Sequence, residues 1–481
     1  MMTEQEAEKA VADILDRGVG TFVDPGEKFR RNLLAKAQGK YEKEIIVKFG
    51  VDPTRPDIHL GHAVVLRKLR QMQDIGCKII FLIGDVTAQI GDPTGKSKVR
   101  PEIDFKAIEE NVKTYLEQVD KILRVERDEK NEIKHGHLFS WIRNSDWYLG
   151  VTDMSFKQKE PIIWSTKDDS GIERRIHIDP NSFIGKAIGF DSVRMQTNKL
   201  HLKGVHGITL ITVLAVLRQI SQAQLIERDM FQERIKDGEP LFMHEMLYPV
   251  LQGIDSSTLS QIYGSCDLEV GGTDQTFNML MGRKTMEIAK RPEQQAVLAF
   301  DLLVGLDGKE KMSKSLDNYV GITDAPNDMF GKIMSVPDSA LASYLELCTF
   351  TPMTEVEVIA KGLATGKLHP KEVKMDLGQQ IVEIYHGREA GSAARKYFVD
   401  TFQKKELPKD MHEVHITKDA LLADVLVSEK LVASKSEFRR LLDEGAIRID
   451  GETKITDPFV KLSESIVFKI GKHRFVKIIV K

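Results

Sequence analysis

The spacing of hydrophobic and polar residues in the first part of this chain predicts alternating strands and helices. Residues 45–50 form a short apolar run that stops at a glycine, which is typical of a buried strand. A turn at residues 52–56 leads into the helix-like pattern of residues 59–72, and residues 78–84 form a second apolar run. A strand, a helix and a strand in this order predict a βαβ unit, and therefore a parallel sheet in an α/β nucleotide-binding layer.

The pattern continues beyond this unit but is interrupted once. Apolar residues at steps of three and four predict an amphipathic helix over residues 105–123. Residues 150–205 are rich in Lys, Asp, Gly and Ser and contain short β-like pieces, which indicates a β-rich insertion. Helices resume at residue 209, and residues 267–272 are expected to form a strand that enters a glycine-rich turn.

These patterns divide the chain into consecutive parts. A helical segment at residues 1–44 precedes a Rossmann-like parallel-sheet catalytic domain at residues 45–321, which carries the insertion. We expect a helical domain at residues 322–402, a polar linker at residues 403–417 and a small α+β domain at residues 418–481. The fold class predicted for the main domain is α/β.

Composition narrows the classes of protein to which the chain could belong. A length of 481 residues favours two to four domains, and 41% hydrophobic with 29% charged residues is typical of a soluble globular protein. The net charge of −3 argues against a protein coated in basic charge but allows a local basic face. Cys77, Cys266 and Cys348 are too far apart in sequence to suggest a disulfide framework or a cysteine zinc site. With an acidic N-terminus and no apolar run of about 20 residues, a cytoplasmic protein without a membrane span is expected.

The first candidate for chemistry is the sequence His-Leu-Gly-His at residues 59–62. His59 and His62 are spaced to share one face at the start of a helix, where oriented N–H groups favour phosphate. Gly61 removes a side chain between them, so an adenine ring could lie against the backbone. An accidental pair or a structural metal site is the alternative, although the His-x-x-His spacing alone is weak evidence for a metal.

The second candidate is the sequence Lys-Met-Ser-Lys-Ser at residues 311–315. Two lysines three residues apart, together with two hydroxyl groups, suit a polyanion, although many such pairs are only solvated basic loops. The pentapeptide follows a turn-rich stretch at residues 305–310, which is suited to a mobile loop. In combination with the histidine motif upstream, it resembles the signature of the class I aminoacyl-tRNA synthetases.

Further motifs in the same order narrow the resemblance to the tyrosyl-tRNA synthetases. These motifs lie at residues 52–54, 90–96, 248–255 and 271–275, and the resemblance covers nearly the whole chain outside the insertion. It implies a ligase that joins tyrosine to tRNA(Tyr) with ATP. ATP would enter with Mg²⁺ as a substrate, and neither a tightly bound metal nor an organic cofactor is expected.

The resemblance implies a tyrosine pocket made of Asp52, Asp92, Tyr248, Gln252, Asp255 and Gln275. Asp92, Tyr248 and Gln252 would hold the α-ammonium, Gln275 would lie near the carboxylate, and Asp255 would accept a hydrogen bond from the phenol. The spacing of Tyr248, Gln252 and Asp255 places them on one helix face. A buried carboxylate without a phenol partner would be left unpaired, so we expect phenylalanine to be rejected strongly.

The resemblance also implies an ATP site. Thr54, His59, His62, Lys311 and Lys314 would act on the phosphates as catalytic residues. Gly272 and Asp274 would meet the ribose. The full set implied to bind ATP is Gly61, Gly272, Asp274, Lys311, Met312, Ser313, Lys314, Ser315 and Lys96. For Lys96, as for Arg100, a solvated loop is an equal alternative.

One position departs from the family pattern. Many tyrosyl-tRNA synthetases have a tyrosine that contacts the phenol two residues before the glycine of the Gly-x-Asp-Pro-Thr turn. This chain has Lys48 there. Either the chain belongs to a subgroup that builds the phenol site differently, or part of the pocket has shifted, and Lys48 itself is not expected to bind tyrosine.

The C-terminal part resembles the S4 RNA-binding domain at residues 434–442 and 445–451. Lysines alternate with β-branched residues near the end of the chain and would form one basic face suited to phosphates. The residues implied to bind RNA are Lys435, Arg439, Arg440, Lys472 and Arg474. The alternative is a small α+β cap with charged edges. The preceding helical domain would hold the helices that face the anticodon.

Some alternatives remain open at this point. A tryptophanyl-tRNA synthetase shares the fold and both ATP motifs, but Asp255 and the S4-like part disfavour it. A catalytically silent RNA-binding relative is disfavoured by the intact histidines and lysines of the two motifs. A homodimer is expected, and the insertion at about 150–205 is either a solvated decoration or a modified dimer interface.

Overall fold

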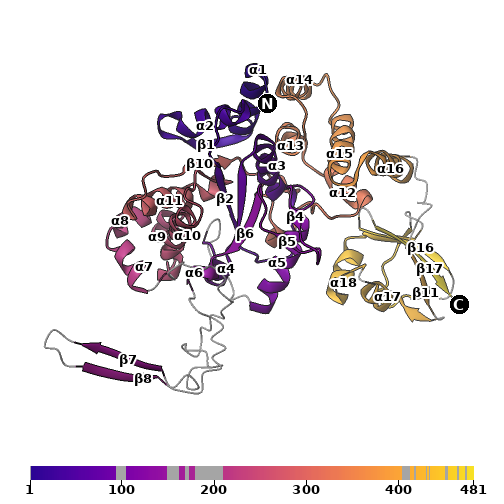
Figure 1. The fold of residues 1–481 in the computed structure, drawn as a ribbon. Helices are drawn as coiled ribbons and strands as arrows, with labels where there is room; N and C mark the ends of the chain where they lie inside the picture. Colours follow the sequence, from indigo (N-terminus) through magenta and orange to yellow (C-terminus); the bar gives the residue numbers. More distant parts are fainter. Residues whose placement is uncertain are drawn as a thin grey trace. The chain divides into compact units, whose positions relative to one another are not determined.

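The computed structural model of the chain divides into two compact units. The first is Met1–Leu303 with Lys311–Ile322, and the second is Val304–Glu310 with Thr323–Lys481 (Figure 1). The structure describes residues 2–93, 105–148, 162–167, 173–178, 208, 210–403, 412–416, 419–429, 431–432, 434–449, 453–462, 465–471 and 474–480.

The first unit is built on a six-stranded sheet whose central strands are parallel. In spatial order its strands are β1 (Val19–Val23), β10 (Ala296–Phe300), β9 (Leu268–Gly272), β2 (Ile46–Val51), β3 (Lys78–Ile83) and β6 (Phe139–Arg143). β2, helix α3 (Leu60–Ile75) and β3 form the predicted βαβ unit, and the predicted strand near residues 267–272 is β9. The α/β fold class is therefore confirmed. The nearly continuous apolar runs of β3 and β10 fit strands that are covered on both faces.

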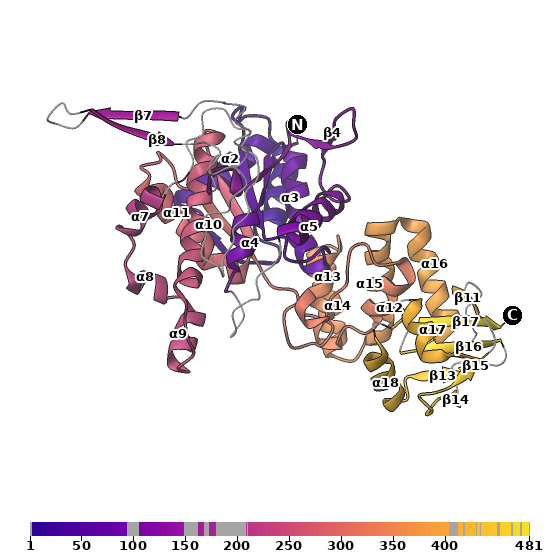
Figure 2. The ribbon, with the colours of Figure 1, turned by 90° about the horizontal axis from the view of Figure 1, so that it is seen from below.

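Helices cover the two faces of this sheet. Figures 1 and 2 show α3 on one face, and α10 (Met243–Ile262) and α11 (Thr276–Ile288) on the other. Because side chains alternate along a strand, Ile80 and Leu82 pack in one core cluster with Leu259 of α10, whereas Phe81 contacts Phe49 on the opposite face. The face toward α10 also carries Lys48, whose side chain is wholly buried.

The remaining elements of the first unit are shorter. The helices are α1 (Glu4–Leu15), α2 (Lys28–Ala37), α4 (Asp85–Ile90), α5 (Phe105–Val119), α6 (Ser145–Tyr148), α7 (Leu210–Leu217), α8 (Gln222–Ile226) and α9 (Asp229–Lys236). The strands outside the main sheet are β4 (Glu126–Arg127), β5 (Ile133–Lys134), β7 (Ile162–Lys167) and β8 (Glu173–Ile178). The predicted amphipathic helix is α5, which ends before residue 123 because the chain continues as turns, with the Ile122 N–H bonded to the Val119 carbonyl.

The second unit begins with the predicted helical region. Its helices are α12 (Pro326–Met334), α13 (Leu341–Cys348), α14 (Met353–Ala364), α15 (Pro370–His386) and α16 (Arg388–Phe398). Proline occupies the first position of α12 and α15, where its missing N–H costs no helical hydrogen bond. The expectation of a strongly helical stretch from residue 322 to residue 402 is confirmed for this region.

The C-terminal part of the second unit has a five-stranded sheet in the order β11-β17-β16-β13-β14. Its elements are β11 (His412–Ile416), β12 (Ala420–Leu421), α17 (Leu422–Ser428), α18 (Lys435–Asp443), β13 (Ile447–Ile449), β14 (Thr453–Lys454), β15 (Lys461–Leu462), β16 (Ile466–Ile470) and β17 (Arg474–Val480). α18 covers the stretch near residues 434–442 that resembles the S4 domain, and the Ser434 side chain caps it by accepting from the Glu437 N–H. β17 contains part of the alternating pattern of lysines and β-branched residues near the end of the chain.

The N-terminal segment is not purely helical, because it contains strand β1, which pairs antiparallel with β10. β1 obtains its hydrogen bonds from a strand that is distant in sequence, so local patterning could not reveal it. Most of the expected insertion lies outside the described residues, and its described pieces, β7 and β8, pair antiparallel. Most of the expected linker, residues 404–411 with 417, also lies outside them.

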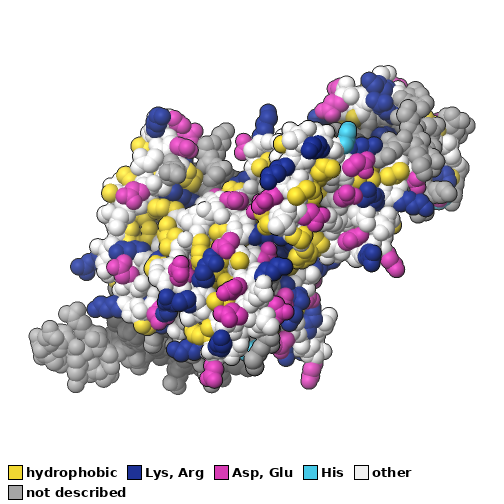
Figure 3. All heavy atoms as spheres, turned by 90° about the horizontal axis from the view of Figure 1, so that it is seen from above, with side chains coloured by type: hydrophobic (Ala, Val, Ile, Leu, Met, Phe, Trp, Pro, Cys, Tyr) yellow, Lys and Arg dark blue, Asp and Glu magenta, His cyan; other side chains and the backbone are white. Residues whose placement is uncertain are grey.

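The described surface carries both signs of charge. Figure 3 shows Lys and Arg side chains interspersed with Asp and Glu over the face it presents, which agrees with a net charge of −3. Within the parts of the chain that the structure describes, no helix combines the length and apolar character needed to span a bilayer.

Candidate active site

The candidate site lies where parallel strands of the first unit end. β2, β3 and β9 run in the same direction, so their carboxyl ends share one edge of the sheet. Asp52 follows β2, Gly84 follows β3 and Asp274 follows β9. Open α/β sheets bind ligands at this edge, because the loops that leave the strands converge there.

Asp52 joins the loop after β2 to helix α10. Its Oδ2 accepts a hydrogen bond from the Tyr248 hydroxyl at 2.9 Å, and its Oδ1 accepts from the Thr87 hydroxyl at 2.8 Å. A Cβ atom at Gly84 would lie 2.2 Å from Asp52 Oδ1, so glycine at this position leaves room for the carboxylate. Asp52 and Tyr248, which were both predicted for the tyrosine pocket, are therefore in direct contact.

Asp92 and Gln275 form a second contact among the predicted residues. The Gln275 amide nitrogen donates to Asp92 Oδ2 at 2.6 Å, and the Asn278 amide donates to Gln275 Oε1 at 3.0 Å. Arg228, which the sequence analysis did not single out, places a guanidinium nitrogen 3.6 Å from Asp92 Oδ1. The carboxylate of Asp92 is thus held between an amide and a cation.

Asp255 is buried at the other end of the predicted pocket and is only 2% exposed. Its Oδ1 accepts from the Trp147 indole N–H at 2.9 Å, and its Oδ2 lies 3.4 Å from the Asn144 amide nitrogen. Burial raises the pKa of Asp255 to about 7, opposed first by the charge of Lys48. Sequence reasoning missed Asn144 and Trp147, although the polar residues that directly follow β6 were a signal that they sit at the carboxyl edge.

Gln252, the remaining predicted tyrosine ligand, faces a carboxylate that was not predicted. Its amide nitrogen donates to Glu269 Oε1 at 3.1 Å. Glu269 also pairs with Lys48, whose Nζ lies 2.8 Å from the same oxygen. Lys48 is therefore held in the protein core by Glu269.

The two histidines lie together at the start of α3. His59 is the residue that precedes the helix, so the helix begins one residue later than expected. The ring centroids of His59 and His62 are 3.9 Å apart, and the His59 backbone N–H lies 3.4 Å from His62 Nδ1. Burial lowers the pKa of His59 to about 3 and that of His62 well below its usual range, so both rings are neutral near pH 7. A Cβ atom at Gly61 would lie 3.0 Å from the His59 ring, which is a tight contact.

The two lysines of the second motif have partners at the same edge of the sheet. Lys311 Nζ lies 2.5 Å from Asp274 Oδ2, in the turn after β9. Lys314 Nζ donates to the Arg55 carbonyl at 3.1 Å and lies 2.8 Å from the Tyr115 hydroxyl. Burial lowers the pKa of Lys314 to about 8. The motif therefore reaches both the histidine side and the Asp274 side of the site.

The other residues of the predicted ATP set are distributed around these lysines. Met312 is buried, and its backbone N–H donates to the Leu303 carbonyl at 2.7 Å. The Ser313 N–H donates to the Asn318 side chain at 2.8 Å, which holds the motif in a turn. Thr54 lies in the turn after β2, where its N–H donates to the Asp52 carbonyl. Gly272 ends β9, and a Cβ there would come within 2.8 Å of Asp274.

Two groups of predicted residues are separate from this cluster or outside the described part. Lys96 and Arg100 lie outside the described residues, as do Lys472 and the side chain of Ser315. The predicted RNA-binding residues are in the second unit, where Lys435, Arg439 and Arg440 expose their side chains along α18. Lys435 pairs with Asp424, and a guanidinium nitrogen of Arg474 lies 3.9 Å from Glu437.

Comparison with known proteins identifies the family. The family of class I tRNA synthetases for tryptophan and tyrosine (W and Y) matches residues 40–155 and 182–403. The Tyrosine--tRNA ligase of Moorella thermoacetica is 38% identical over 99% of this chain and 97% of its own length. The enzyme of the same name from Francisella tularensis is 35% identical over 98% of this chain and 99% of its own length.

Solved structures support the fold. The mitochondrial tyrosyl-tRNA synthetase of Aspergillus nidulans, truncated at its C-terminus, superposes with a TM-score of 0.54 at 20% identity, covering 83% of this chain and 97% of that one. The tyrosyl-tRNA synthetase of Archaeoglobus fulgidus, solved with L-tyrosine, gives 0.51 at 18% identity, covering 81% and 99%. These comparisons favour neither a tryptophanyl enzyme nor a silent relative. This chain belongs to the tyrosyl-tRNA synthetases, a family of class I aminoacyl-tRNA ligases.

Proposed function

We propose that this chain activates tyrosine with MgATP and then transfers it to the 3′ end of tRNA(Tyr). The observation that carries the proposal is the meeting of two residue sets at one sheet edge. Asp52 contacts Tyr248 there, while Lys311 contacts Asp274 in the neighbouring turn. The first set suits an amino acid, and the second suits a nucleoside triphosphate. An enzyme that activates an amino acid needs both within one site.

The chemistry of the first set fits tyrosine. An ammonium group requires acceptors, and Asp92, Gln252 and Tyr248 offer carboxylate, amide and hydroxyl oxygens. Gln275, which touches Asp92, is our candidate for the carboxylate end, and Asp52 lines the same pocket. Asp255 is buried beside the Trp147 and Asn144 N–H donors and the Tyr148 hydroxyl, and in our proposal its carboxylate also accepts a hydrogen bond from the phenol of tyrosine. Phenylalanine could not supply that hydrogen bond.

The chemistry of the second set fits the triphosphate and ribose of ATP. Lys311 and Lys314 carry the positive charge, and His59 and His62 act as neutral hydrogen-bond donors toward the phosphates. In our proposal Asp274 and the backbone at Gly272 meet the ribose, so Lys311 must exchange its contact with Asp274 for phosphate oxygens. Further phosphate and adenine contacts are assigned to Thr54, Gly61, Lys96, Met312, Ser313 and Ser315.

Two steps follow from this arrangement. The tyrosine carboxylate attacks the α-phosphate of MgATP in line, forming tyrosyl-adenylate and releasing pyrophosphate. The terminal ribose hydroxyl of the tRNA then attacks the acyl carbon and displaces AMP. Both steps depend on positioning and charge stabilisation, and no covalent bond to the enzyme is required.

In this proposal the second unit binds the tRNA. Lys435, Arg439 and Arg440 expose cationic side chains along α18, a form suited to phosphate contacts, and Arg474 and Lys472 extend this basic set. The helices α12 to α16 are proposed to face the anticodon. We also propose a cytoplasmic homodimer, as the resemblance to the tyrosyl-tRNA synthetases implies.

ATP–pyrophosphate exchange with tyrosine, tryptophan and phenylalanine tests the proposal. We expect exchange with tyrosine alone, because only its phenol can donate to Asp255. Exchange with tryptophan in place of tyrosine would assign the chain to the other enzyme of this class. The absence of exchange with all three would indicate a silent RNA-binding protein.

Substitution of the motif lysines tests the ATP side of the site. Lys311→Ala or Lys314→Ala should slow tyrosine activation by on the order of a hundredfold, because a cation near the leaving pyrophosphate is lost. The tyrosine KM should change little, since neither lysine contacts the tyrosine residues. Lys309→Ala is the matched control, because Lys309 is an exposed lysine beside the motif, and it should leave the rate unchanged. A normal rate with weak tyrosine binding would contradict the assignment.

The raised pKa of Asp255 predicts a pH dependence of tyrosine binding. The phenol needs the ionised carboxylate as acceptor, and the ionised fraction rises as the pH passes through about 7. Tyrosine should therefore bind about tenfold more tightly at pH 8 than at pH 6, as measured by calorimetry without ATP. Asp255→Asn should bind weakly and without this dependence. An affinity that falls over this range in the unsubstituted chain would show that Asp255 is not the phenol acceptor.

A further inference from the structure

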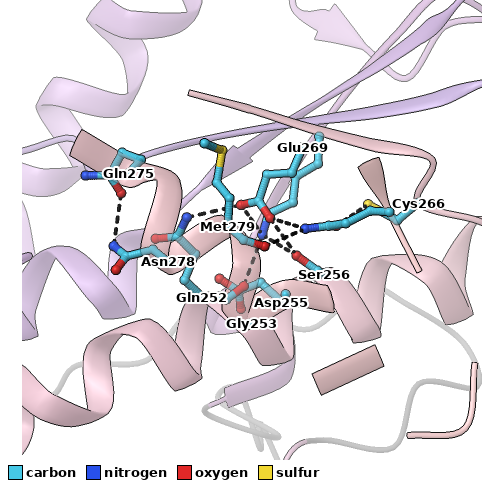
Figure 4. Close-up of polar contacts among 12 residues, drawn as sticks. Gln252, Gly253, Asp255, Ser256, Cys266, Glu269, Gln275, Asn278 and Met279 are labelled. Carbon is cyan, nitrogen blue, oxygen red and sulfur yellow. Dashed lines mark hydrogen bonds and ion pairs between the residues drawn. The ribbon is translucent and has the colours of Figure 1, made fainter. Parts of the chain in front are cut away.

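A buried ion pair between Lys48 and Glu269 lies next to the proposed tyrosine pocket and joins β2, β9 and α10. Figure 4 shows Glu269 with its neighbours Gln252 and Ser256. Lys48 and Glu269 are paired residues on neighbouring parallel strands, so their side chains leave the sheet on the same face, toward α10. Lys48 Nζ lies 2.8 Å from Glu269 Oε1, and the two side chains are 0% and 2% exposed. Two charges so deeply buried are costly unless their remaining hydrogen bonds are made.

The surrounding side chains make those hydrogen bonds. Lys48 Nζ also donates to the backbone carbonyl of Gln252 at 3.0 Å and lies 2.8 Å from the Ser256 hydroxyl. With Glu269, all three of its N–H donors therefore have acceptors. Glu269 accepts in turn from the Ser256 hydroxyl at 3.0 Å, from the Gln252 amide at 3.1 Å and from the Gln295 amide. A buried polar network that is satisfied in this way holds its members in fixed orientations.

A glycine on the neighbouring helix α11 makes space for this network. A Cβ atom at Gly282 would lie 2.4 Å from Gln295 Nε2, 2.8 Å from Ser256 Oγ and 3.1 Å from Glu269 Oε2. Any larger residue would push these groups apart. The pair is therefore accommodated by packing from β2, β9, α10 and α11 together.

The ion pair fixes which way the Gln252 amide points. A carboxylate only accepts hydrogen bonds, so the Gln252 NH₂ group must face Glu269. The amide oxygen takes no part in the network, and Figure 4 shows the nitrogen of Gln252 directed at Glu269 while its oxygen is directed elsewhere. That oxygen is the acceptor which an ammonium group requires. If Glu269 did not hold the nitrogen, the amide could rotate and present N–H groups to the ammonium instead.

We propose that Lys48 and Glu269 are positioning residues for tyrosine, which orient the Gln252 amide so that its oxygen receives the α-ammonium group. The proposal rests on the proposed activation of tyrosine and goes beyond it, because neither residue touches the substrate. Lys48 acts by holding the Glu269 carboxylate close to the backbone carbonyl of Gln252.

If the ion pair only stabilised the packing of α10 on the sheet, its loss would have a different effect. The stability of the protein would fall, and tyrosine and ATP binding would weaken alike, whether or not Gln252 is present. An orienting role acts on tyrosine affinity through Gln252. A double-mutant cycle between positions 269 and 252 separates the two roles.

The test compares Glu269→Gln, Gln252→Ala and the double variant. Glu269→Gln keeps the size of the side chain but replaces the carboxylate with an amide, so Gln252 is no longer forced into one orientation. Tyrosine should bind about tenfold more weakly, which is the loss expected for one hydrogen bond to a charged group. The ATP KM in pyrophosphate exchange should stay within about twofold. In the Gln252→Ala background, Glu269→Gln should add no further loss of tyrosine affinity.

Stability is controlled separately, because Glu269→Gln leaves Lys48 as an uncompensated buried charge. Lys48→Met combined with Glu269→Gln removes both charges together and is expected to fold even if the single variant does not. It should show the same weakened tyrosine binding. Glu245→Gln is the matched control, because Glu245 forms a buried ion pair with Arg234 at 2.8 Å near the start of α10. This control should lower the melting temperature and leave tyrosine affinity unchanged.

Several outcomes would overturn the positioning role. Glu269→Gln could weaken tyrosine binding equally with and without Gln252, or Glu245→Gln could weaken it as much as Glu269→Gln does. Unchanged tyrosine affinity in the folded Lys48→Met/Glu269→Gln variant would also contradict it. Failure of the unsubstituted chain to bind tyrosine would instead contradict the proposed function, so the two failures are distinguishable.

Discussion

The shared direction of the central strands is the constraint on which the rest of the structure depends. Because β2, β3, β6 and β9 are parallel, their carboxyl ends meet at one edge, and the loops that leave them carry most of the polar residues of the candidate site. Asp52, Asn144 and Asp274 are far apart in sequence and reach this edge for that reason alone. Helix α10 supplies the remaining wall, with Tyr248 and Asp255 on its buried side.

The interior beside this edge contains several buried polar groups. Lys48 and Glu269 are buried as an ion pair, and Asp255 is buried among neutral donors. For the ion pair, the energetic cost of burial is offset by complete hydrogen bonding. For Asp255 the cost is only partly offset, since burial raises its pKa to about 7. A carboxyl group in that condition gains most from a new hydrogen-bond donor. This difference fits a structural and orienting role for the pair and a binding role for Asp255.

The sequence predicted what depends on local pattern and on signature residues. The βαβ unit of β2, α3 and β3 and the amphipathic helix α5 follow from apolar spacing, and the structure agrees. Both motifs were recognised, and both reach the same edge of the sheet. The family assignment rested on several motifs in order, which chance rarely reproduces.

What the sequence could not predict depends on pairing between distant segments. Strand β1 is short and gains its hydrogen bonds only from β10. Lys48 was recognised as a departure from the family pattern, but its partner Glu269 follows from the register between β2 and β9, which a single sequence does not state. Trp147 and Asn144 reach Asp255 only because β6 is parallel to β3. In each case tertiary pairing, and not local preference, determines the contact.

The most direct test of the central claim is a crystal structure of the chain with a non-hydrolysable analogue of tyrosyl-adenylate. The account predicts that the ammonium lies against Asp92 and the amide oxygen of Gln252, and that the phenol hydroxyl donates to Asp255. The ribose should lie at Asp274, with Lys311 turned toward the phosphate. A tyrosyl group whose phenol lies away from Asp255, or whose ammonium meets the nitrogen of Gln252, would contradict it.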